Sequence, residues 1–265
     1  MNDPQRVMSQ ENEGKLVSAL VRGISILQCF SPTVQELSGR ELAEMTALPK
    51  PTLFRLLETL CELGLLRYSE RVSKYVPGLG LLNLAAPALA RMAVRQLARP
   101  LMQDLANQID GQLQITVGSG RNLSCVEIVQ GTNSKVFRPE VGVHVSLSRT
   151  ASGRAYLCTL APPQRASLLA EIDGEEPSRN NWLAERIQDA QSDLEAHGFC
   201  RSHGDLHREI SSIAVPMQKT LDDESWIFAA SVPVFSPHSK QLESDVGPRL
   251  IALVRSVEAS LGNWS

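Results

Sequence analysis

The chain contains 265 residues with 26 basic and 29 acidic side chains, for a formal net charge of −3, so its overall charge gives no sign of a nucleic-acid partner. This length can form two domains with buried cores, and no apolar run is long enough to cross a bilayer, so we expect a soluble protein. The five cysteines are scattered without a CxxC pair and the first residues are polar, so we expect a cytoplasmic protein with a disordered tail over residues 1–14.

A first helix is expected from about Leu16 to Phe30, because Leu20, Ile24 and Leu27 recur on one side of it. Arg22 lies on another side of this helix, where it can contact a DNA phosphate. Residues 15–78, which we expect to form one domain, contain eight basic and six acidic side chains, so the rest of the chain is net acidic. This modest asymmetry is consistent with a basic module joined to an acidic domain.

Two further helices are expected in close succession. The first begins at Ser38, because Ser38 and Glu41 have the spacing of a capping box. Its end is expected at Leu48, where the following Pro49 disfavours helical backbone. The second helix starts at once, since Pro51 suits a first helical turn.

The second of these helices has two different faces. Leucines at helical spacing form the side expected to be buried, namely Leu53, Leu56, Leu57, Leu60 and Leu63. The opposite side begins with Lys50, Thr52 and Arg55, which are residue types that contact phosphates and base edges in a major groove. Gly64 is expected to end the helix in the left-handed conformation. Two short alternating strands over 65–68 and 74–76 then form a basic hairpin.

This order of elements predicts a winged helix-turn-helix, which is a DNA-reading module. The residues expected to contact DNA are Arg22, Arg40, Lys50, Thr52, Arg55, Arg71, Ser73 and Lys74. The alternative is a small helical subdomain with an ordinary solvated face.

Six segments along the chain carry a resemblance to a known family. In the first half they are LVRGISILQCF, ELAEMTALPKPTLFRLLETLCELGLLRY and YVPGLGLLNL; in the second half they are VGVHVSLSRTASGRAYL, HGFCRSHGDLHREISSIAVP and IFAASVPV. In this order and spacing, which span nearly the whole chain, they resemble the IclR-type bacterial transcription regulators. The resemblance implies a sequence-specific regulator that binds double-stranded operator DNA and a small-molecule effector. It also implies that the first helix pairs two DNA domains in a homodimer, which associates to a tetramer.

The remaining chain is expected to have an α+β fold. Residues 79–99 are predicted to form one linker helix, and Pro100 restarts a helix that opens an effector-binding domain over 100–265. Strands are expected over 112–117, 123–129, 213–217 and 226–234, with shorter ones near 135–137 and 144–147. Helices are expected over 152–159, 163–172, 181–197 and 242–261. This order predicts an antiparallel sheet with helices covering one side, and the resemblance implies a GAF- or PAS-like sensing domain.

The turn from Thr150 to Arg154 is the best candidate for a small-molecule site. Its first residues are expected to cap a helix, whose free N–H groups can hold a carboxylate. The candidate binding residues in this turn are Ala151, Ser152 and Gly153. Arg138 is a possible counter-ion, or a surface arginine. The alternative for the turn is a plain helix cap with no ligand.

The resemblance implies further pocket residues. Ser202, Asp205 and Ser212 match polar positions of the family's pocket, and Val232 and Val234 match its facing strand. Many relatives have serine at the two valine positions. The valines therefore predict a more apolar wall and an aromatic or alkyl acid as the effector.

Other chemistries find little support in the sequence. His203 and His207 have helical metal-ligand spacing, but Gly204 between them indicates a loop, so we expect no metal and no cofactor. The chain lacks a G-x-S-x-G elbow, a P-loop and a G-x-G-x-x-G motif, so we expect no enzyme activity. The functional alternative is a ligand-binding interaction module without DNA binding.

Overall fold

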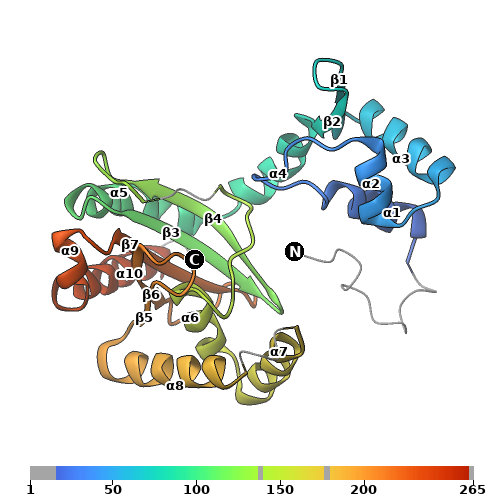
Figure 1. Cartoon of the computed structure of the whole chain (residues 1–265). Helices are drawn as coiled ribbons and strands as arrows, with labels where there is room; N and C mark the ends of the chain where they lie inside the picture. The colour runs from blue at the N-terminus through green and yellow to red at the C-terminus, as the bar shows by residue number, and fades with distance from the viewer. Residues whose placement is uncertain (1–15, 137–139, 176–179, 263–265) are drawn as a thin grey trace. The chain divides into compact units, whose positions relative to one another are not determined.

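The computed structural model describes residues 16–136, 140–175 and 180–262, and its contacts divide the chain into two compact units that meet between Arg91 and Met92 (Figure 1). The predicted tail over 1–14 and the predicted pocket residue Arg138 lie outside the described residues. Within the described residues, no helix is both long and apolar enough to cross a bilayer.

The first unit is a winged helix-turn-helix, as predicted. Its elements in order are α1 (Ser18–Leu27), α2 (Gly39–Thr46), α3 (Lys50–Glu62), β1 (Leu66–Ser69), β2 (Lys74–Pro77) and α4 (Gly80–Ala90). Strands β1 and β2 pair antiparallel and form the wing. Apolar side chains form the core between α1, α2, α3 and β1, with Ile26, Leu42, Leu53, Leu57 and Leu66 at most 1% exposed.

Local sequence signals set the limits of α2 and α3. Ser38 caps α2 through the predicted capping box, in which the Glu41 N–H donates to Ser38 Oγ at 3.2 Å and the Ser38 N–H donates to Glu41 Oε2 at 2.7 Å. Helix α2 ends at Thr46, two residues before the predicted end, because Ala47 takes the left-handed conformation with φ of 52°. Gly64 follows α3 with φ of 67°, as predicted.

The predicted single linker helix over 79–99 is wrong. Helix α4 ends at Ala90, the backbone is non-helical at Met92, with φ of −80° and ψ of 77°, and α5 runs over Ala93–Gln108. Pro100 lies inside α5 and does not start a helix. Val94 and Ala98 are buried in the core of the second unit, so residues 93–99 belong to that unit's fold.

The second unit contains one five-stranded antiparallel sheet in the order β4-β3-β7-β6-β5. The strands are β3 (Gln112–Ser119), β4 (Asn122–Gln130), β5 (Cys200–His203), β6 (Ile210–Pro216) and β7 (Ser225–Pro233). The predicted strands near 135–137 and 144–147 do not form in the described residues, where His144 makes only an isolated bridge to Ser124. Strand β5 was not among the strands expected from the sequence.

Helices cover both faces of this sheet, so the expectation of helices on one side is wrong (Figure 1). Successive residues of β7 alternate between two cores: Phe228 packs with α5 and α10 (Gly247–Gly262), and Ala229 packs with α6 (Ala151–Thr159) and α8 (Asn180–His197). The remaining helices are α7 (Pro162–Glu175), α9 (Pro237–Lys240) and a π-helical turn over Leu242–Val246. A sheet buried on both faces explains why β7 is apolar or small at nearly every position.

Candidate functional sites

The start of α3 presents polar groups at the surface of the first unit. Lys50 and Arg55 are exposed and Thr52 is half-buried. Thr52 and Arg55 border a groove of about 520 Å³ between α1 and α3, and Arg22 of α1 borders the same groove. The structure therefore brings three of the predicted DNA-contacting residues together, and Lys50 begins the same helix.

Of the other predicted DNA-contacting residues, Arg40, Arg71 and Lys74 lie near carboxylates, and Ser73 lies at the turn of the wing. Arg40 Nε lies 2.9 Å from Glu44 Oε1, Arg71 lies 3.6 Å from Glu36, and Lys74 Nζ lies 3.1 Å from Glu41. Ser73 is exposed at the turn of the wing, with φ of 53°. Exposed ion pairs are weak, so phosphates can compete for these cations.

Glu41 serves two structural purposes beside this surface. Hydrogen bonds lower the pKa of Glu41 from 4.5 to about 2; the largest contribution comes from Ser38, chiefly its backbone N–H, and a smaller one from Lys74. The carboxylate therefore stays ionised across the physiological range and ties the wing to the start of α2.

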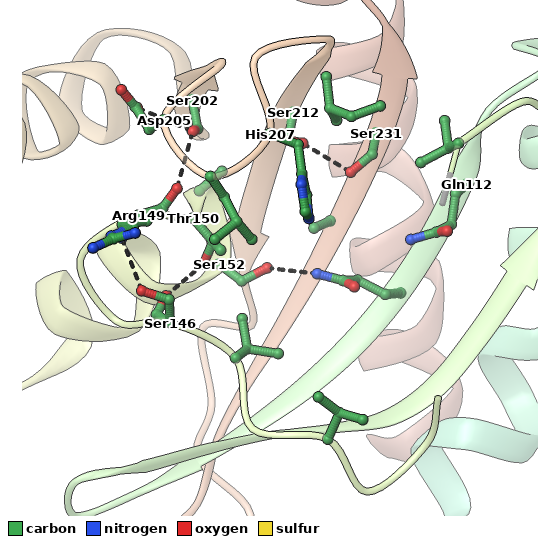
Figure 2. A pocket seen from close by; sticks show the side chains of 18 of the residues that line it. Gln112, Ser146, Arg149, Thr150, Ser152, Ser202, Asp205, His207, Ser212 and Ser231 are labelled. Atoms are coloured by element: carbon green, nitrogen blue, oxygen red, sulfur yellow. Dashed lines mark hydrogen bonds between the residues drawn. The ribbon is translucent and has the colours of Figure 1, made fainter. Parts of the chain in front are cut away.

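The second unit contains a cavity of about 300 Å³ on the face of the sheet that α6 covers (Figure 2). The cavity lies over β3, β7 and β6 and is bordered by the segment 143–146, the start of α6 and the loop between β5 and β6. Small side chains on the sheet leave the space: Ala229 and Ser231 on β7 and Ser212 on β6 all line it.

The N-terminus of α6 opens into this cavity. Thr150 caps the helix by accepting the Gly153 N–H at 2.9 Å, and its own hydroxyl donates to Ser146 O at 2.7 Å. Ala151 and Ser152 line the cavity, and no acidic residue lies in the first turn. The helix dipole and the first-turn N–H groups therefore favour an anion here.

The predicted pocket residue Gly153 is not among the residues that line the cavity. A Cβ at this position would lie 2.3 Å from Ser146 O and 2.4 Å from Leu147 O. Glycine is needed because the preceding segment passes directly against the helix start.

A row of polar side chains crosses the sheet beneath the cavity. Backbone pairing aligns Gln112 of β3 with Ser231 of β7, Ser231 with Ser212 of β6, and Ser212 with Ser202 of β5. All four side chains line the cavity (Figure 2). The Ser212 and Ser231 hydroxyls are 2.8 Å apart, and Ser202 Oγ donates to Arg149 O at 3.4 Å.

Asp205 lies at the cavity wall but its charge is already compensated. Its Oδ2 accepts from Arg154 Nη2 at 2.6 Å and from Ser202 Oγ at 3.1 Å. The Arg154 side chain is 3% exposed, also donates to Ser148 O and Arg201 O, and lies 5.5 Å from the Trp182 ring. Asp205 therefore anchors the β5–β6 loop to α6.

The structure places the two predicted valines away from the cavity. Val232 is fully buried and points to the opposite face of the sheet, into the core with α5 and α10. Val234 lies beyond the end of β7, is 47% exposed, and donates its N–H to Glu209 O. Since Ala229 and Ser231 occupy the cavity side of β7, the apolar wall expected from the valines is absent from that strand.

Several cavity residues were missed at the sequence level: Gln112, Gln114, His144, Ser146, Arg149, His207 and Ser231. His207, considered above as a metal ligand, points from the β5–β6 loop into the cavity (Figure 2). Among the described residues, no three His, Cys, Asp or Glu side chains gather as metal ligands. The alternating pattern of β3 could have indicated Gln112 and Gln114, because both fall on one face of that strand.

Family models match both units. The IclR helix-turn-helix domain matches residues 19–70, and the bacterial transcriptional regulator IclR C-terminal domain matches residues 86–259. The HTH-type transcriptional regulator TsaQ1/TsaQ2 of Comamonas testosteroni is 30% identical over 258 residues, which cover 95% of this chain and 91% of that protein.

Solved structures show the same fold. The crystal structure of an IclR family transcriptional regulator from Brucella abortus matches with a TM-score of 0.83 and 32% identity, over 98% of each chain. An IclR homologue from Microbacterium hydrocarbonoxydans, crystallised with 4-hydroxybenzoate, matches with a TM-score of 0.69 and 17% identity, over 90% of this chain and 99% of that one. With family models over both units and a relative 30% identical along nearly its whole length, this chain belongs to the IclR family of DNA-binding transcription regulators with a C-terminal ligand-binding domain.

Proposed function

We propose that this protein is a cytoplasmic, non-enzymatic regulator that binds an operator through α3 and its wing and responds to an organic acid in the α6 cavity. The observation that carries the proposal is the anion-favouring N-terminus of α6, which borders a cavity in the same chain as a winged helix-turn-helix. An aromatic acid suits this space, since a cavity of about 300 Å³ is at the small end of ligand sites. The relative crystallised with 4-hydroxybenzoate supports the same ligand class.

The proposed DNA contacts divide into two groups. Lys50, Thr52 and Arg55 start the helix that enters a major groove in this type of module, so we assign them to base edges and nearby phosphates. Arg22, Arg40, Arg71, Ser73 and Lys74 surround that helix on α1, α2 and the wing, and we assign them to the DNA backbone.

We also propose that the protein acts as a homodimer that associates to a tetramer. Helix α4 is rich in leucine and alanine, yet none of its described residues is buried, and Leu82 and Leu84 are 66% and 67% exposed. On α1, Leu20 is 66% exposed. Large apolar side chains at this level of exposure are typical of surfaces that bind another protein, and a two-fold dimer suits a palindromic operator.

The DNA assignment is tested by replacing Arg55, with an arginine of α10 as the matched control. Arg55→Ala should weaken operator binding by about 1–3 kcal/mol if the guanidinium reads a base. Arg249→Ala, which removes an arginine from the second unit, should leave the affinity unchanged. Fluorescence anisotropy on DNA from upstream of the gene and its neighbours gives both values. Equal affinities for the wild type and Arg55→Ala would remove Arg55 from the reading helix.

The pocket assignment is tested by filling the cavity. Ser152→Trp places a large ring at the α6 N-terminus and should abolish the response to acids while sparing DNA binding. Ser212→Leu is a milder second variant, because Ser212 is only half-buried. An unaltered dose–response curve in both folded variants would move the effector site elsewhere.

A further inference from the structure

One residue that lines the cavity, Gln112, has a buried polar atom without a hydrogen-bond partner. Gln112 begins β3, is 4% exposed and lines the cavity (Figure 2). Its amide oxygen, Oε1, is fully buried and has no hydrogen-bond partner within the described part of the chain. A buried amide without a partner is costly, and such groups are rare in native proteins. Since the side chain lines the cavity, a molecule bound there is the group that would satisfy Oε1.

The distance between Gln112 and the start of α6 determines which part of a bound acid the Gln112 amide would contact. Gln114 lies on the same face of β3, and its Nε2 donates to Ser152 Oγ at 3.3 Å, which places Gln114 beside the start of α6. Two residues along a strand span roughly 6.5–7 Å. The Gln112 amide is therefore one step further along the sheet from the anion-favouring end of the cavity, about the distance across a substituted benzene ring.

The chemistry of the amide selects the ligand group. An amide offers one acceptor and two donors, and a hydroxyl can donate to Oε1 and accept from Nε2 at once. A second carboxylate could not donate to Oε1. The neighbours in the same row, Ser231 and Ser212, are neutral and their hydroxyls already bond to each other at 2.8 Å. This end of the cavity is built for a neutral group that both donates and accepts.

We propose that the effector is a hydroxylated aromatic acid, with its carboxylate at the N-terminus of α6 and its hydroxyl on the Gln112 amide. Gln112 then determines specificity by distinguishing hydroxylated acids from those without the hydroxyl. This inference rests on the proposed function of the cavity, and it adds the class of ligand and the residue that selects it.

The test compares three acids on the full-length protein by isothermal titration calorimetry. 4-Hydroxybenzoate should bind about tenfold more tightly than benzoate, because benzoate leaves the buried amide unpaired. 2-Hydroxybenzoate should bind no better than benzoate, since its hydroxyl lies beside the carboxylate and cannot reach Gln112.

Two variants assign the discrimination to the amide. Gln112→Met keeps a long unbranched side chain and removes the amide, so benzoate and 4-hydroxybenzoate should then bind within about twofold of each other. Thr116→Val is the matched control: it removes a buried polar group from the same strand, outside the cavity lining, and should keep the preference.

The outcomes separate this inference from the proposed function. Equal wild-type affinities for benzoate and 4-hydroxybenzoate would overturn the inference and leave an acid-binding cavity. A preference that persists in Gln112→Met would overturn the assignment to Gln112. Binding of none of the three acids by the wild-type protein would overturn both the inference and the proposed aromatic effector. The wild-type comparison decides the first and last of these even if a variant fails to fold.

Discussion

Asp205→Ala is expected to destabilise the second unit strongly, because it leaves the Arg154 charge buried without its carboxylate. The Arg154 side chain is 3% exposed and the Asp205 side chain is 17% exposed. Breaking a buried ion pair from one side costs about 3–5 kcal/mol. Arg154 retains two carbonyl acceptors and the Trp182 ring, and water can reach Asp205, so we expect the lower end, about 3 kcal/mol.

Tryptophan fluorescence in urea measures this effect selectively, because Trp182 and Trp226 lie in the second unit and the sequence has no tryptophan before residue 182. With a slope of about 2 kcal/mol per molar urea, the midpoint should fall by about 1.5 M. Asp205→Ala combined with Arg154→Met should recover more than half of the loss, since no buried charge remains.

The matched control for this prediction is Asp189→Ala, which breaks an exposed ion pair with Arg186 and should change stability by less than about 0.5 kcal/mol. A midpoint for Asp205→Ala equal to that of the control would refute the claim that the Asp205–Arg154 pair anchors the loop. The claim would also be refuted if the double variant Asp205→Ala/Arg154→Met were no more stable than Asp205→Ala alone.

Three further predictions follow from local geometry. The pKa of Glu41 is lowered to about 2, so its carboxylate stabilises the fold above about pH 4.5 and this stabilisation is lost as the pH falls toward 2. The stability advantage of the wild type over Glu41→Gln should therefore narrow between about pH 5 and pH 3. A constant difference between their melting temperatures, followed by circular dichroism over this range, would contradict this. Gly153→Ala places a Cβ 2.3 Å from Ser146 O, so calorimetry should show at least about a tenfold loss of acid affinity; unchanged binding would mean that the segment shifts freely. Burial raises the pKa of the Cys125 thiol to about 11, so iodoacetamide at about pH 8 should label it only after unfolding; equal labelling of folded and unfolded protein, read by peptide mapping, would contradict its burial.

The helix-turn-helix was predictable because its signals are local. Ser38 and Glu41 satisfy each other's backbone and side-chain groups within one turn, and Gly64 takes a left-handed conformation that favours glycine. The leucine spacing of α3 identified its buried face, with Leu53, Leu57 and Leu60 in the core. None of these signals depends on distant parts of the chain.

The second unit was harder to predict because its strands are specified by partners far away in the sequence. Strand β5 is four residues long and includes Ser202 and His203, and it exists through pairing with β6. Both faces of β7 are buried, so hydrophobicity alone does not tell which side a residue faces. Val232 was placed in the cavity by the family resemblance, and the sequence of β7 offered no alternation that would have corrected this or indicated its neighbour Ser231.

The linker region and the polar floor of the cavity illustrate the same limit. Residues 79–99 have helical character throughout, but only α5, with Val94 and Ala98, packs into the core of the second unit, and periodicity does not report the break at Met92. Gln112 is one glutamine among several in the sequence. The alternation of β3 places Gln112 on one face with Gln114, but its place in a polar row depends on β7 and β6, which align Ser231 and Ser212 beside it.

The central claim is that operator binding and acid binding are coupled in one protein. The most direct measurement is fluorescence anisotropy of the wild-type protein on upstream DNA, at two salt concentrations, with and without 4-hydroxybenzoate, paired with calorimetry of the acid on free and DNA-bound protein. We predict binding to one DNA segment that weakens with salt, and an acid that changes DNA affinity by the same factor by which DNA changes acid affinity. Segment-specific DNA binding that no acid shifts would contradict the coupling, and the absence of segment-specific binding at either salt would contradict the assignment as an operator-binding regulator.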